Sequence, residues 1–287
     1  MSRILAVGNY KGGVGKTLIS KTIAEYAAIV KRKRVLMIDL DPQTNLSRRY
    51  LDMEPSGHQG ADYQPPLHPD FDPSDTDWNG RSDSSDIWYG GGCEPYPTEY
   101  DGLELIPAHS GRLQDIELAR KAEVFDQIVR RLNDFLTLPV VQETYDLIVL
   151  DTRPSRGPLV QAALHAATDL LIPSEMEAPS IEGLHGMLSV RSRVNQARSR
   201  DKALNLVGIL PNKVKANTRL HEEFMGYLRG DPVIGPALLP IQIPDWMGFR
   251  ESMVFGEPSL FLQPESNRFR KTLETVSEHV LQSVFQR

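Results

Sequence analysis

Residues 8–17 read Gly8-Asn9-Tyr10-Lys11-Gly12-Gly13-Val14-Gly15-Lys16-Thr17. This glycine-rich loop follows a short apolar stretch, residues 4–7, that is typical of a buried strand. A segment with helical spacing comes directly after the loop. At such a junction, backbone N–H groups and a helix N-terminus converge on one place, where anionic oxygens bind. Because glycine lets the backbone approach these oxygens closely, the sequence predicts a phosphate-binding loop here.

The loop differs at one position from the usual nucleotide-binding pattern. The pattern G-x-x-x-x-G-K-[ST] requires a glycine where this chain has Tyr10. The pattern assigns Lys16 to the β- and γ-phosphates and the Thr17 hydroxyl to Mg²⁺, so ATP and Mg²⁺ are the expected cofactors. The residues expected to hold the nucleotide are Lys11, Gly12, Gly13, Val14, Gly15, Lys16, Thr17 and Leu18.

The additional lysine, Lys11, connects the loop to a known family. The run from Lys11 to Thr17 resembles the deviant Walker A motif of ATPases that include ParA/Soj partition proteins, MinD and the nitrogenase iron protein. The resemblance implies a slow ATP hydrolase that forms an ATP-sandwiched homodimer. It also implies that Lys11 contacts the nucleotide of the partner subunit, as a cation supplied in trans. The resemblance covers residues 1–51 and 102–287.

Aspartates at two strand ends extend the predicted site. The run from Asp39 to Gln43 is similar to the first switch of ParA-type proteins, which implies that Asp41 positions the attacking water. The apolar strand at 147–150 ends at Asp151, where a Walker B carboxylate would hold Mg²⁺ through a water. Asp39 is an indirect candidate for the same ion. The expected catalytic residues are therefore Lys11, Lys16 and Asp41.

Two further features come from the same resemblance. The family typically continues Asp-Thr-Pro-Pro-Ser in its second switch, whereas this chain has Arg153 in place of the first proline. Arg153 is open to four interpretations: contact with phosphate, with the partner subunit or with DNA, or simple exposure. Asn212 matches the asparagine that contacts adenine in the family, and Asp245 lies near the other adenine-side loop.

Apolar strands and amphipathic helices alternate along most of the chain. Strands are expected at 35–38, 103–106, 147–150, 170–172 and 204–210. Helices are expected at 16–30, 113–136, 159–167, 181–197, 218–228 and 267–285, with Val30 and Val124 among their inward residues. This order predicts an α/β fold, a mainly parallel twisted sheet flanked by helices, in a P-loop ATPase domain spanning 1–287.

An acidic insertion at about 52–102 interrupts the alternation. Between Asp52 and Glu104 there are 13 acidic residues and one basic residue, although the whole chain carries only −6. Prolines and a run of three glycines predict a poorly regular segment, and its role as a lid, a DNA mimic or an adaptor dock stays open. His58, His68 and Cys93 are expected to be ordinary surface residues, too scattered for a metal site.

Outside the insertion the chain is basic, and its lysines and arginines cluster. Such clusters bind phosphate backbones without reading sequence, which predicts non-specific binding to double-stranded DNA. The candidates are Arg191, Arg193, Arg198, Arg200, Lys213, Lys215, Arg219, Arg268, Arg270 and Lys271. The ParA resemblance then implies plasmid or chromosome partition by a cytoplasmic, nucleoid-associated dimer, with hydrolysis stimulated by a ParB-type adaptor.

Two alternative functions stay open at this stage. One is ParA-like positioning of a protein cargo, such as a microcompartment or chemosensory cluster. The other is a MinD-like membrane regulator, which the weakly basic end of the chain does not favour. An iron–sulfur protein is excluded because Cys93 is the only cysteine.

Overall fold

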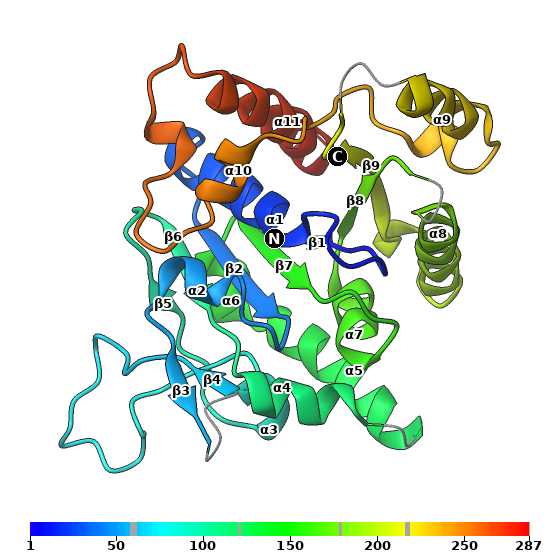
Figure 1. Ribbon diagram of the computed structural model, residues 1–287. Helices are drawn as coiled ribbons and strands as arrows, with labels where there is room; N and C mark the ends of the chain where they lie inside the picture. Colours follow the sequence, from blue (N-terminus) through cyan, green and yellow to red (C-terminus); the bar gives the residue numbers. More distant parts are fainter. Residues whose placement is uncertain (58–61, 120–121, 178–179, 216–218, 287) are drawn as a thin grey trace.

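A seven-stranded sheet forms the centre of the molecule in the computed structural model, which describes residues 1–57, 62–119, 122–177, 180–215 and 219–286 (Figure 1). Its strand order is β5-β6-β2-β7-β1-β8-β9. The strands are β1 (Arg3–Val7), β2 (Val35–Leu40), β5 (Tyr96–Pro97), β6 (Leu103–Ile106), β7 (Leu147–Thr152), β8 (Asp169–Glu175) and β9 (Asn205–Asn212). Only β5 pairs antiparallel among these described strands, so the predicted mainly parallel α/β fold is confirmed.

Helices cover both faces of the sheet, which explains why its central strands β2 and β7 are buried along their whole length and begin with four apolar residues each. One face packs against α1 (Lys16–Glu25) and α11 (Arg268–Phe285). The other face packs against α4 (Ser110–Glu117), α5 (Ala122–Leu136), α7 (Pro158–Ala166) and α8 (Ser180–Gln196). The remaining helices are α2 (Ser47–Tyr50), α3 (Asp86–Tyr89), α6 (Pro139–Thr144), α9 (Arg219–Gly230) and α10 (Met247–Glu251). No helix in the described ranges is long and apolar enough to cross a membrane.

Two predicted helices differ from the observed ones. The helix expected at 16–30 becomes a π-helical turn at Tyr26–Val30, whose wider winding leaves Val30 partly exposed instead of inward. The helix expected at 113–136 is two helices, because α4 ends at Glu117 and α5 begins at Ala122. The apolar period continues across this break, so periodicity alone could not reveal it, and Val124 is exposed rather than inward. Thr218, the expected first residue of α9, lies outside the described residues.

The insertion packs against the body of the protein. It contains a hairpin, β3 (Glu54–Ser56) with β4 (Asp62–Gln64), together with α3 and the edge strand β5. Trp88 is buried and donates its indole N–H to the Ile128 carbonyl of α5 at 2.9 Å. The expectation that His68 lies on the surface is wrong, because its ring is buried 4.6 Å from the Tyr96 ring, centroid to centroid. His58 lies outside the described residues. Aromatic side chains therefore fix much of this acidic segment in place.

A buried charge network ties helix α1 to the segment after the first switch. Glu25 lies 3.2 Å from the Lys21 ammonium and 3.7 Å from the Arg49 guanidinium, and all three side chains are buried. Glu25 also accepts hydrogen bonds from the hydroxyls of Tyr50 and Ser259. Because buried charges are costly without partners, removing any one of them leaves the others uncompensated.

We predict that Arg49→Met lowers the free energy of unfolding by about 3–5 kcal/mol, since it leaves Glu25 without one of its two cations. The matched control is Arg48→Met, because Arg48 stacks over Tyr63 instead of entering the network. Urea unfolding of both variants tests this. Equal, small losses in the two variants would contradict the prediction.

Candidate nucleotide-binding site

The site lies where the central parallel strands end. Val7 and Asp39 are both in register with Asp151, on the strands that flank β7. The loop after β1 and the carboxylates near the ends of β2 and β7 therefore meet at one edge of the sheet, the usual place for ligands in such folds.

Glycine at position 15 is required by the loop geometry. Gly15 caps α1 in a left-handed conformation, with φ of 87°, and a Cβ there would overlap the Asn212 amide. No side chain caps the start of α1, so its first N–H groups face the loop. The Lys16 ammonium folds back onto the Lys11 carbonyl at 3.1 Å, and burial lowers its pKa while the nearby Asp151 and Asp41 raise it.

The surroundings of Asp151 fit a magnesium ion. Its Oδ1 accepts a hydrogen bond from Ser20 at 2.8 Å. Its Oδ2 is buried and makes no hydrogen bond with any residue that the structure describes. The Thr17 hydroxyl lies close enough to lower the pKa of this carboxyl. An unsatisfied carboxylate oxygen beside a threonine hydroxyl at a P-loop is the donor set that Mg²⁺ takes in P-loop proteins.

Burial shifts the titration of both strand-end carboxyls. Desolvation, followed by the charge of Asp39, raises the pKa of Asp151 to about 8. Desolvation also raises the pKa of Asp39 to about 7, against the hydrogen bonds from Ser47. Asp39 accepts from the backbone of Asp41 and from both the N–H and the hydroxyl of Ser47. Since protein donors engage both oxygens, Asp39 is better explained as an anchor of the first switch than as an indirect metal ligand.

Asp41 lies two residues after Asp39, directly beyond the end of β2. It is buried, and its carboxylate accepts a hydrogen bond from the Gln43 N–H at 3.0 Å. Thr44 closes the turn in a left-handed conformation, with φ of 55°. The loop therefore holds Asp41 at the same sheet edge as Lys16 and Asp151, where its charge raises the pKa of Lys16.

Lys11 makes contacts within its own chain. Its ammonium pairs with Glu177, lies 3.6 Å from Glu175 and donates to the Ser180 hydroxyl at 3.3 Å. Glu175 is the last residue of β8, the strand that pairs with β1, and Glu177 lies two residues further along the chain. Sequence reasoning missed them, although acidic residues at the carboxyl end of a strand next to the P-loop strand were the available signal.

The end of β9 lies on the phosphate loop, through its last residue, Asn212, and the next residue, Lys213. The Asn212 amide is buried and donates to the Val14 carbonyl at 2.8 Å. Lys213 was expected at a DNA surface, but its ammonium binds the Gly13 carbonyl at 2.5 Å and Glu175 at 2.8 Å. Asp245, expected near the adenine, binds the exposed Arg250 at 2.8 Å. The chain from β9 therefore covers one side of the loop.

The remaining residues predicted to bind DNA form two groups, those whose side chains bind other parts of the chain and those that are exposed. Arg191 donates to the Leu204 carbonyl, Arg198 to four carbonyls that include those of Ala167 and His165, and Arg270 to Glu274 and Gln263. These three were expected on a DNA surface and instead serve the fold. The exposed candidates are Arg193, Arg200, Lys215, Arg268 and Lys271. The Arg219 side chain lies outside the described residues.

Comparison with known proteins identifies the family. The model of the CobQ/CobB/MinD/ParA nucleotide binding domain matches residues 5–248. The chain belongs to this family. It is 30% identical over 283 residues to the sporulation initiation inhibitor protein Soj of Bacillus subtilis, covering 97% of this chain and 98% of Soj. It is 28% identical to the chromosome-partitioning ATPase Soj of Thermus thermophilus, covering 97% and 96%.

Solved structures give the same fold. A variant of Cyanothece McdA in complex with ATP superposes with a TM-score of 0.71 at 17% identity, covering 97% of this chain and 96% of that one. Cobyrinic acid a,c-diamide synthase of Mycobacterium smegmatis, solved with ADP and magnesium, gives 0.67 at 23%, covering 98% and 95%. The predicted kinship with ParA/Soj-type partition ATPases is thereby confirmed, and so is the MgATP cofactor at the level of the family.

We predict that Asp151→Asn flattens the pH dependence of stability in the nucleotide-free protein. The raised pKa means that the folded carboxyl keeps a proton that the unfolded chain has lost, so stability falls as pH rises from about 4 to about 8. The wild type should lose at least about 1 kcal/mol more than the variant between pH 5 and 8. Urea unfolding at both pH values measures this, and parallel pH profiles would contradict it. MgATP should raise the melting temperature of the wild type alone.

We predict that Arg198→Met lowers the free energy of unfolding by about 2–3 kcal/mol, because charged hydrogen bonds to four carbonyls, three of them partly buried, are lost. The control is Arg193→Met on the same helical region, where the arginine is exposed and a change within about 0.5 kcal/mol is expected. Thermal and urea unfolding of both variants distinguish the roles. An unaltered stability of Arg198→Met would return Arg198 to the DNA candidates.

Proposed function

We propose that this protein is a ParA-type ATPase that partitions a plasmid or chromosome. It binds MgATP, closes into a homodimer across the nucleotide and then binds double-stranded DNA without sequence preference. A ParB-type adaptor on the cargo stimulates hydrolysis and releases the dimer. The observation that carries the proposal is Lys11, a second lysine of the phosphate loop, whose partly exposed side chain is bound in its own chain by Glu175, Glu177 and Ser180.

Each site residue has a role in this proposal. The loop amides and Lys16 bind the phosphates, while Thr17 and Asp151 hold Mg²⁺, which neutralises phosphate charge when bound. Asp41 orients the attacking water, and Asn212 borders the adenine. Lys11 leaves Glu175 and Glu177 and contacts the nucleotide of the partner subunit. These two glutamates bind Lys11 in the single chain, so its transfer has to exchange one set of anions for another.

The DNA surface in this proposal consists of the exposed cations alone. Arg193 and Arg200 belong to α8 and the turn after it, while Arg268 and Lys271 begin α11. Lys215 follows β9. Binding through such contacts weakens steeply with salt, because each neutralised phosphate releases counterions. The dimer is proposed to be cytoplasmic and nucleoid-associated in its ATP state.

We predict that random-sequence duplex DNA binds the wild type only with ATP and loses at least about tenfold in affinity between roughly 50 and 200 mM salt. Lys11→Ala should abolish this binding while retaining ATP, because the trans contact closes the dimer. The control is Lys31→Ala, a lysine paired with Glu278 away from the loop. Fluorescence anisotropy measures DNA binding, and light scattering measures dimer mass.

The outcomes separate the candidate functions. ATP-dependent dimerisation without DNA binding would overturn the nucleoid model. Unchanged dimerisation of Lys11→Ala would overturn the trans role of this lysine. DNA affinity that falls equally for Lys11→Ala and Lys31→Ala would mean that the lysines act only through general charge.

A further inference from the structure

Helix α4 holds the second switch through one buried carboxylate. Glu117, the last residue of α4, accepts hydrogen bonds from the Ser155 hydroxyl and from the Leu159 N–H, the latter at 3.4 Å. Its Oε1 lies 3.9 Å from the Arg153 guanidinium, which also donates to Gln114 at 3.3 Å. A single side chain thus spans the loop between β7 and α7, and it also binds the N-terminus of α7, where anions are favoured.

The sequence of the loop is adapted to this carboxylate. A Cβ at Gly157 would overlap both oxygens of Glu117, so only glycine lets the carboxylate approach. On its other side the loop meets the phosphate loop, because a Cβ at Gly12 would lie 3.6 Å from the Pro154 ring. Glu117 therefore fixes the second switch against the place where the terminal phosphate is proposed to bind.

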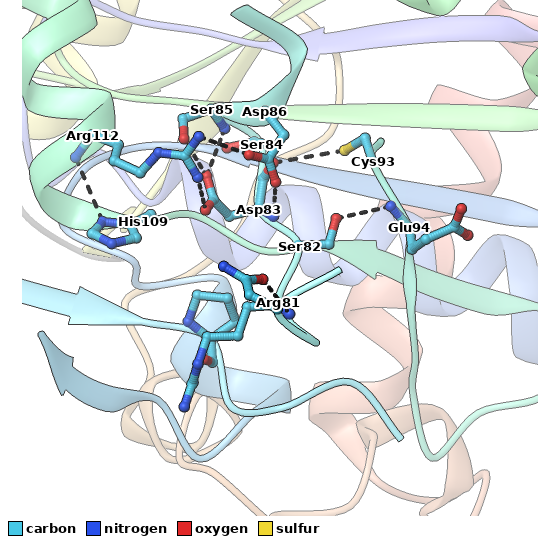
Figure 2. Close-up of polar contacts among 12 residues, drawn as sticks. Arg81, Ser82, Asp83, Ser84, Ser85, Asp86, Cys93, Glu94, His109 and Arg112 are labelled. Carbon is cyan, nitrogen blue, oxygen red and sulfur yellow. Dashed lines mark hydrogen bonds and ion pairs between the residues drawn. The ribbon is translucent and has the colours of Figure 1, made fainter. Parts of the chain in front are cut away.

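The first turn of the same helix is held by the insertion. The Arg112 guanidinium forms two ion pairs, with Asp83 and with Asp86, each at 2.7 Å (Figure 2). Asp83 is buried, and its pKa is raised by desolvation, so this pair is not a solvated surface contact. Between the two aspartates, Ser84 donates its hydroxyl to the Asp39 carbonyl at 2.7 Å, at the start of the first switch.

We propose that Glu117 is a positioning residue for ATP hydrolysis and that the insertion acts on the second switch through α4. Asp83 and Asp86 set the place of α4 through Arg112, and α4 sets the place of Arg153 to Gly157 through Glu117. This answers the open question of Arg153: its guanidinium faces α4 and helps to fix the loop. The inference rests on the proposed ATPase function for its kinetic readout only.

The test compares four variants of the full chain. Glu117→Ala removes the acceptor, whereas Glu117→Gln keeps an oxygen for Ser155 and loses the charge toward Arg153. Arg112→Met cuts the link to the insertion. The matched control is Arg81→Met, an arginine near the same cluster that binds Glu54 and the Pro65 carbonyl instead of α4.

Two readouts report on the loop and on the reaction. Trypsin followed by mass spectrometry measures cleavage after Arg156, a bond inside the second switch, while Pro154 protects the bond after Arg153. This readout needs no nucleotide. The second readout is the turnover number for ATP beside the dissociation constant of a fluorescent ATP analogue, at a temperature where thermal unfolding shows every variant to be folded.

We expect Glu117→Ala to speed cleavage after Arg156 and to lower turnover roughly tenfold, with the dissociation constant within about twofold. Glu117→Gln should fall between it and the wild type, and Arg112→Met should change both readouts in the same direction. Arg81→Met should match the wild type.

Other results overturn the inference. Unchanged cleavage and turnover in Glu117→Ala would refute the positioning role. Identical behaviour of Arg112→Met and Arg81→Met would refute the coupling to the insertion. Weaker nucleotide binding in proportion to lost turnover would mean that Glu117 only supports the fold. A wild type that neither binds nor hydrolyses ATP would refute the proposed function, while the cleavage readout would still decide the role of Glu117.

Discussion

The structure depends on one constraint, the burial of two carboxylates side by side at the end of a parallel sheet. Parallel pairing puts Asp39 and Asp151 in register on adjacent strands, and apolar packing on both faces excludes water from them. Burial raises the pKa of both carboxyls, the charge of Asp39 raises that of Asp151 further, and such a place favours a bound cation. The Lys16 ammonium and the proposed magnesium ion are the cations that the surrounding fold can bring there.

The local signals in the sequence predicted the centre of the fold and most of the site. Strand β6 appears at the predicted residues, and Asp151 is the last residue but one of β7, in register with Val7 at the start of the phosphate loop. These predictions succeeded because a buried parallel strand and a glycine-rich turn are determined by short, contiguous runs of residues. The expectation that Lys11 contacts the nucleotide of a partner subunit came from the family resemblance, because residue spacing alone does not predict it.

The predictions that failed concern contacts between distant segments. Arg198 lies in a basic run, yet its guanidinium binds carbonyls at the end of α7, some thirty residues earlier in the chain. Lys213 turns onto the phosphate loop because the backbone after β9 adopts a left-handed conformation, with φ of 53°. A count of charges along the sequence cannot separate cations that satisfy carbonyls from cations that meet solvent.

The same distinction changes the meaning of the acidic insertion. Its net negative charge suggests a solvated segment or a DNA mimic, but several of its carboxylates form ion pairs with arginines of the same chain. Asp83 and Asp86 neutralise Arg112, and Glu99 lies 3.4 Å from the buried Arg49. The insertion contacts the first switch through Ser84 and helix α4 through Arg112, and both contacts lie outside the phosphate loop. A segment held by ion pairs to a helix that ends on the second switch has a direct mechanical route to the site, which a freely solvated acidic loop would lack.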